Sequence, residues 1–148
     1  MFSNDFTTPP KDNSDVVKQV FDTLIYSIKR KTNEGEAVSL INSLIQELKE
    51  DHSFLQYVKL KDTRLLEDDD IVNVDSEINS VTPTEIGKAI NSAILILSRY
   101  LGTKNGYFLI KEFQQRIGSN YFSSIRAMGI DLDLLILEHK VAAIYDIL

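Results

Sequence analysis

Residues 82–102 read TPTEIGKAINSAILILSRYLG and carry the strongest structural signal in the chain. Thr82, Pro83 and Glu85 stand at the capping, first and third positions of a helix start, which is the pattern of a capping box with an initial proline. Apolar residues then recur at helical spacing and, in the second half, surround the helix almost completely. Gly102 is expected to end this helix as a left-handed cap. We predict a helix of about 19 residues that forms the centre of the core.

Two amphipathic helices are predicted in the N-terminal third. The first begins with Ser14 as its N-cap and ends at the basic triplet Lys29-Arg30-Lys31, where cations suit the helix dipole. After a turn at residues 32–35, a second apolar stripe runs to Leu48. The short loop predicts an antiparallel helical hairpin over residues 14–50. Each stripe is wider than a two-helix seam, so the hairpin must pack against further helices.

The connector at residues 51–81 carries mixed signals. It could form short extended pieces at 54–61 and 71–74, where β-branched and aromatic residues occur. Between them lie four consecutive acids, which repel one another and favour solvent. These acids, which we call the acidic loop, are Glu67, Asp68, Asp69 and Asp70. They lack the alternating ligands and the glycine of a calcium loop, and they could dock on a basic partner surface.

Shorter helices separated by glycines are expected in the C-terminal third. A turn at residues 102–106 precedes a helix at 107–117. Ser119 is expected to cap a fifth helix, which Gly129 ends. A last helix then continues to the end of the chain.

Together these patterns predict an all-α fold, a single domain of five to six helices with an irregular middle segment. The helical domain spans residues 14–148 and consists of the hairpin 14–50, the connector 51–81 and a helical cluster at 82–148. Residues 1–13, which contain two consecutive prolines, are predicted to be a disordered tail.

The composition argues against several kinds of function. The chain has 148 residues, no Cys, two His and 16 basic against 22 acidic side chains, for a net charge of −6. Without Cys there is no thiolate metal site and no cysteine nucleophile. A negative charge disfavours binding to nucleic acid. No stretch approaches the roughly 20 apolar residues that span a bilayer, and the N-terminus does not resemble a secretory signal. We therefore expect a cytoplasmic protein without nucleic-acid or membrane partners.

His52 and His139 are the candidates for acid–base or phosphotransfer chemistry. His52 follows the second helix beside Asp51, whereas His139 lies on the last helix between Glu138 and Lys140. His139 is the better candidate, but we interpret both as exposed or capping histidines. No hydrolase elbow, dinucleotide motif, phosphate-binding loop or paired Glu-x-x-His motif is present. The sequence therefore predicts no catalytic residue, no metal and no cofactor.

The C-terminal segment 132–148 carries the most informative positive signal, because twelve of its seventeen residues are apolar. Either Asp131 or Asp133 is expected to cap it. Burying one large apolar side chain stabilises a protein by about 1.5–3 kcal/mol, so this helix must be docked. It is either a buried central helix or a helix that packs one face on the core and the other on a second subunit. The candidate partner-interface residues are Leu134, Leu137, Val141, Ile144, Tyr145 and Leu148.

The sequence favours a non-enzymatic interaction or regulatory module, such as a signalling or assembly component. Its expected partner is another protein or a second copy of the chain in a homodimer, bound through the C-terminal helix. The alternative is a small phosphotransfer or small-molecule-binding helical protein that uses His139 or His52.

Overall fold

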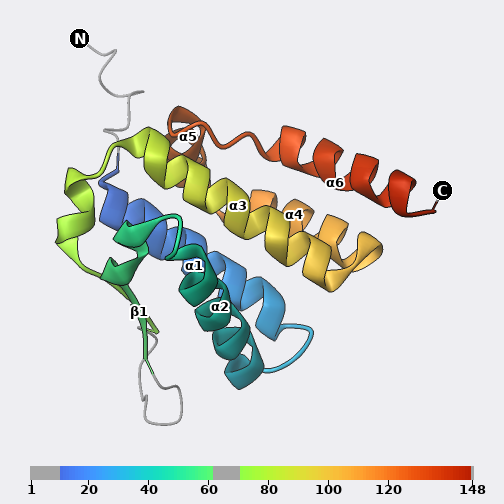
Figure 1. The fold of residues 1–148 in the computed structure, drawn as a ribbon, viewed down its shortest axis with the longest axis horizontal. Coiled ribbons are helices and arrows are strands. Elements are labelled where there is room, and N and C mark those ends of the chain that lie inside the picture. The colour runs from blue at the N-terminus through green and yellow to red at the C-terminus, as the bar shows by residue number, and fades with distance from the viewer. Residues whose placement is uncertain (1–10, 62–70, 148) are drawn as a thin grey trace.

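The computed structural model describes residues 11–61 and 71–147, with the side chains of residues 142, 143 and 145–147 left out. The acidic loop and Leu148 lie outside the described residues, as do residues 1–10 of the predicted tail. The described part forms a single helical domain with one small sheet (Figure 1). This arrangement confirms the prediction of an all-α fold.

Six α-helices follow one another along the described chain. They are α1 (Asn13–Lys29), α2 (Glu34–Leu48), α3 (Pro83–Leu101), α4 (Thr103–Arg116), α5 (Ser119–Ala127) and α6 (Leu132–Ile147). Helices α1 and α2 form the predicted hairpin, and α3 and α4 pack against each other and against α1. Helix α6 lies at the edge of the molecule, against α3 and α4 (Figure 1).

Helix α1 is more central than α3, contrary to the expectation from the sequence. It contacts α2, α3, α4, α5 and the small sheet. Helix α3 leaves Ile96 36% exposed and Tyr100 71% exposed, whereas α1 leaves Tyr26 41% exposed. The apolar periodicity of the two helices is similar, and only the tertiary arrangement decides which one is enclosed.

The irregular middle segment contains two short extended pieces, but the first is shorter than predicted because residues 54–57 belong to a 3₁₀ helix. Strands β1 (Val58–Leu60) and β2 (Val72–Val74) pair antiparallel, with Lys59 opposite Asn73. Two 3₁₀ helices flank them, η2 (Ser53–Tyr57) and η4 (Ser76–Ser80). Strand β2 and η4 both contact α1, so this segment is part of the domain.

Helix α1 begins before the predicted cap at Ser14. Asp12 occupies the N-cap position and Asn13 is the first helical residue. The buried Asn13 amide donates to the carbonyl oxygens of Ile78 at 3.1 Å and Val81 at 2.7 Å. This end of α1 is therefore anchored to a segment more than 60 residues away in the chain. A local capping pattern cannot reveal such an anchor.

Two other predicted caps are only partly formed. Thr82 precedes α3 and Pro83 is its first residue, but the Thr82 side chain makes no capping hydrogen bond. Glu85, the other half of the predicted capping box, instead accepts from Lys88 at 3.2 Å. Ser119 is the first residue of α5 and makes no side-chain cap, because Gly118 holds the capping position.

Three glycines at helix junctions have positive φ, as the predicted helix stops require. Their φ angles are 92° at Gly102, 89° at Gly118 and 94° at Gly129. The turn expected at residues 102–106 is reduced to Gly102, because α4 begins at Thr103. With a ψ of 173°, Gly102 is extended rather than in the left-handed helical region. Only glycine adopts this conformation without strain.

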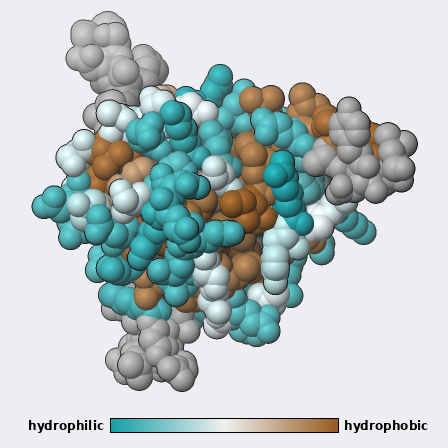
Figure 2. Space-filling model, in the orientation of Figure 1, coloured by the Kyte–Doolittle hydropathy of each residue, from teal (hydrophilic) through white to brown (hydrophobic). Residues whose placement is uncertain are grey.

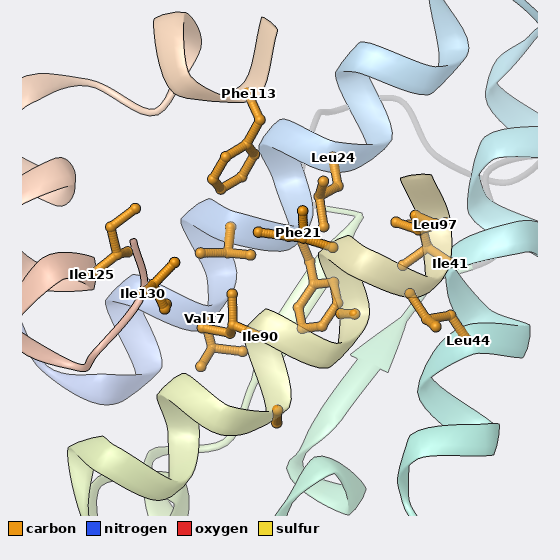
Figure 3. Close-up of a cluster of buried hydrophobic side chains, with 14 of the residues drawn as sticks. Val17, Phe21, Leu24, Ile41, Leu44, Ile90, Leu97, Phe113, Ile125 and Ile130 are labelled. Atoms are coloured by element: carbon orange, nitrogen blue, oxygen red, sulfur yellow. The ribbon is translucent and has the colours of Figure 1, made fainter. Parts of the chain in front are cut away.

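The hydrophobic core is continuous through the described domain. Figure 3 shows Phe21 and Leu24 of α1 in the middle of the cluster, with Ile41 of α2 on one side and Phe113 of α4 on the other. All four side chains are at most 1% exposed. The hairpin and the C-terminal helices therefore share one core, which makes them parts of one cooperative domain.

Candidate interaction surface

Helix α6 is docked through one face. Leu132, Leu135, Ile136 and His139 are all at most 9% exposed and lie on the side that contacts α3 and α4. Of the two predicted caps, Asp131 is the one that forms, because its Oδ1 accepts from the Leu134 backbone N–H at 3.1 Å. The helix is thus fixed at its start and along one side.

The opposite face of α6 carries an exposed apolar stripe. Its members are Leu134, Leu137, Val141 and Ile144, which are 48%, 55%, 42% and 56% exposed. Their spacing of three, four and three residues places them on one side of the helix. Figure 2 shows hydrophobic residues along α6, at the upper right of the view. We call these four residues the α6 stripe.

The α6 stripe corresponds to four of the six predicted partner-interface residues. Tyr145 lies on the same helix, but its side chain is outside the described part of the chain, as is Leu148. Of the two arrangements that the sequence left open, a fully buried helix does not apply, because the stripe is about half exposed. One face is packed on the core and the other is uncovered in the single chain.

Polar groups border the α6 stripe on the side where α6 meets α4. Asp133 accepts a hydrogen bond from the Gln114 amide of α4 at 3.2 Å. The Lys140 ammonium lies 5.1 Å from the centre of the Tyr107 ring, also on α4. An apolar centre with a polar rim is the usual composition of a protein–protein interface.

His139 is not the exposed or capping histidine that the sequence predicted. It is 4% exposed, and its Nε2 lies 2.8 Å from the carbonyl oxygen of Thr103. Its Nδ1 is buried and has no hydrogen-bond partner among the described residues. Because a carbonyl oxygen can only accept, Nε2 is the donor, and the ring fastens α6 to the first turn of α4. The ring therefore lies between α4 and α6 and is not presented to solvent.

His52 is half-buried just before η2. Its ring centre lies 5.8 Å from that of Phe54 in a tilted arrangement. This contact with an apolar ring supports a packing role for His52.

An ion-pair cluster connects the end of α1 to α4, which the sequence did not predict. The Arg30 Nη1 and the Arg116 Nε both donate to Oε2 of Glu112, at 2.7 Å and 2.8 Å. Burial alone would raise the pKa of Glu112, but the hydrogen bonds from Arg30 and Arg116 outweigh it and the pKa is lowered. The basic triplet therefore does more than compensate the dipole of α1, because Arg30 holds two helices together.

Replacing Glu112 by Gln is expected to destabilise the protein near pH 7 by a small amount. The effect is small because the Arg30 and Arg116 side chains are 50% and 39% exposed and therefore screened by solvent. A lowered folded-state pKa contributes stability above the pKa of the unfolded chain, and this is lost as the pH falls through the folded-state value. Urea denaturation of both proteins between about pH 7 and pH 2 measures the difference. A difference that persists at low pH would show that packing, not charge, is responsible.

Neither a metal site nor a membrane span is evident in the described part of the chain. Its His, Asp and Glu residues form no group of three that could hold a metal ion. Among the described helices, none combines the length and the apolar character needed to cross a membrane. Comparison of the chain with protein-family models, curated proteins and solved structures found no match. Inferences about function therefore rest on the surfaces described above.

Proposed function

We propose that this protein is a non-enzymatic interaction module that self-associates by pairing its α6 stripe with the α6 stripe of a second copy. The observation that carries the proposal is the exposure of four large apolar side chains on the face opposite the docked side of α6. Because a separate face holds α6 to its own domain, pairing requires no rearrangement of the core.

A second copy is the occupant that suits the stripe best. Spacings of three and four are those of the seam between two paired helices. A two-fold axis brings identical stripes together, so no additional complementary surface is needed. The stripe extends over about 15 Å of helix, which is short for an obligate dimer. We therefore expect a reversible homodimer with a dissociation constant on the order of micromolar or weaker.

A reversible homodimer of this kind suits a cytoplasmic signalling or assembly component, in which association is adjusted by concentration or by a further partner. The alternative function, a small phosphotransfer or small-molecule-binding protein that uses His139 or His52, has less support. His139 is enclosed between α4 and α6, and the His52 ring packs beside Phe54.

The test is the mass of the protein in solution, measured by sedimentation over a range of concentrations. The wild type is expected to shift from one copy, 16.8 kDa, toward two copies as its concentration rises. Ile144→Glu should remain monomeric, because pairing would bury an unpaired carboxylate in the stripe. Ile96→Glu is the matched control, since the same substitution is made at an exposed isoleucine of α3. A monomeric wild type at high concentration, or equal loss of association in both variants, would contradict the proposal.

A further inference from the structure

A second surface, on α4 and the end of α1, combines positive charge with exposed aromatic rings. It surrounds a broad hollow of about 650 Å³. Four cationic side chains and one carboxylate, Glu112, line this hollow, although the whole chain has a net charge of −6. We call it the basic face, and its cations are Arg30, Lys31, Lys111 and Arg116.

Two of the four cations are not neutralised within the described residues. Arg30 and Arg116 share Glu112, whereas neither Lys31 nor Lys111 forms an ion pair with a described carboxylate. Lys31 instead lies 5.7 Å from the ring centre of Phe108, which is 46% exposed. An exposed ring beside unpaired cations is typical of a binding surface rather than of a surface that only keeps a protein soluble.

A small apolar pocket adjoins the basic face. It has a volume of about 170 Å³ and shares Lys31 and Glu112 with the larger hollow. Its apolar lining includes Ile28, Leu101 and Leu109. An engineered cavity of about 150 Å³ holds a benzene molecule, so this pocket has the size of one large apolar side chain.

The wall of the apolar pocket contains an unsatisfied polar group. The Ser27 hydroxyl is buried, with the residue 2% exposed, and has no hydrogen-bond partner among the described residues. Ser27 is one of the residues that line the pocket, so this hydroxyl belongs to its wall. Buried hydroxyls are nearly always paired in native proteins, and a missing partner here is consistent with a ligand that supplies one.

We propose that the basic face and the apolar pocket together bind an acidic peptide segment that carries a single large apolar side chain. The apolar side chain enters the pocket, where a peptide carbonyl accepts from Ser27. Acidic residues on either side of it lie over Lys31 and Lys111, and the Phe108 ring covers the peptide backbone.

The observations favour a peptide over a single-stranded nucleic acid. Nucleic-acid grooves combine a continuous basic track with several stacked bases. Here the two unpaired lysines lie beside a narrow apolar pocket, and Glu112 lies between the hollows. A base is planar and polar at its edges and would leave those edges unpaired in an apolar lining. A leucine or phenylalanine side chain has no such cost.

This site is separate from the α6 stripe, so it does not depend on the proposed self-association. The stripe faces away from α4, whereas the basic face is made by α1 and α4. Measuring peptide binding on both the wild type and Ile144→Glu separates the two proposals. Peptide binding that is equal in both proteins shows that the basic face works in a single copy.

The experiment measures the fluorescence anisotropy of a labelled peptide, Glu-Asp-Leu-Asp-Glu, titrated with the full chain. Saturable binding that weakens as salt is added is expected. Replacing the peptide's Leu by Ala should weaken binding at least about tenfold, because the alanine side chain is too small to fill the apolar pocket. The double variant Lys31→Ala, Lys111→Ala should weaken binding by about tenfold or more as well.

Three controls make the outcome decisive. The double variant Lys49→Ala, Lys59→Ala removes the same charge at the far end of α2 and on β1, and it should bind the peptide like the wild type. Ser27→Ala should bind several-fold more weakly while unfolding at an equal or higher temperature, since an unpartnered buried hydroxyl is removed. A labelled ten-base single strand of DNA should not bind. The proposal is overturned if the peptide fails to bind, if both lysine pairs have equal effects, or if only the DNA binds.

Discussion

Replacing Gly106 by Ala is expected to cost this protein about 3 kcal/mol of folding stability or more. Gly106 is buried in α4 at the point where three helices meet. A methyl group added there would overlap the backbone carbonyl oxygen of Ser98 in α3 and lie 2.6 Å from Cε1 of His139 in α6. A backbone carbonyl cannot rotate away as a side chain can, so α3 and α4 would have to move apart.

Gly35→Ala is the matched control for this prediction. Gly35 also lies within a helix, α2, but is exposed and would place its new methyl group 3.4 Å from the Asn33 side chain, an ordinary contact. Alanine favours a helix over glycine by about 0.5–1 kcal/mol in a helix interior. Gly35 is the second residue of α2, so Gly35→Ala should stabilise the protein by less than this. Urea denaturation followed by circular dichroism measures both effects. Equal changes in the two variants would mean that helix propensity alone, not the close contact, governs Gly106.

Gly106 also shows where sequence reasoning fails. Gly102 and Gly106 stand four residues apart, and the interval was interpreted as one turn. Gly102 does end α3 with a positive φ, but Gly106 serves the close approach of α4 to α3 and α6. The residue is the same in both cases. A glycine in the sequence indicates either an unusual backbone conformation or a close contact with another element. Only the position of the neighbouring helix shows which of the two applies.

The last helix illustrates a related limit. Its apolar residues form two stripes at helical spacing, one through Leu132, Leu135 and His139 and the other through Leu134, Leu137 and Val141. The sequence predicts a helix that is apolar on more than one face, and α6 has one buried and one exposed apolar face. Which stripe is docked depends on the surface that α3 and α4 present, so the burial of His139 could not be predicted.

The basic face could not be predicted from the sequence because its parts are distant in the chain. Arg30 and Glu112, which form its central ion pair, are 82 residues apart. The sequence indicates that the basic triplet ends a helix, and in the structure Lys29 is the last residue of α1. Its second role depends on the packing of α1 against α4, which places Lys111 and Arg116 beside the triplet. The pocket and its Ser27 hydroxyl have no local sequence signal at all.

The second large effect is expected from Phe113→Ala, which should destabilise the fold by about 3–5 kcal/mol. The Phe113 side chain is 0% exposed and projects from α4 into the core shared with Leu24 of α1 (Figure 3). Removing its ring leaves a cavity between α1 and α4, the two helices that the Arg30–Glu112 ion pair also connects. Helix α4 is also held against α3 by the close approach at Gly106, so it can move toward α1 and close the cavity only in part.

Phe108→Ala is the control on the same helix, five residues earlier. Phe108 is 46% exposed, so its removal should change the free energy of unfolding by less than about 0.5 kcal/mol. The same variant should weaken peptide binding at the basic face, because Lys31 then loses the ring beside it. The two substitutions on α4 are therefore expected to have different effects. Phe113→Ala should change the unfolding curve, and Phe108→Ala should change the peptide-binding curve. If Phe108→Ala destabilised the fold as strongly as Phe113→Ala, its ring would be part of the core, and the exposed aromatic surface on which peptide binding depends would be absent.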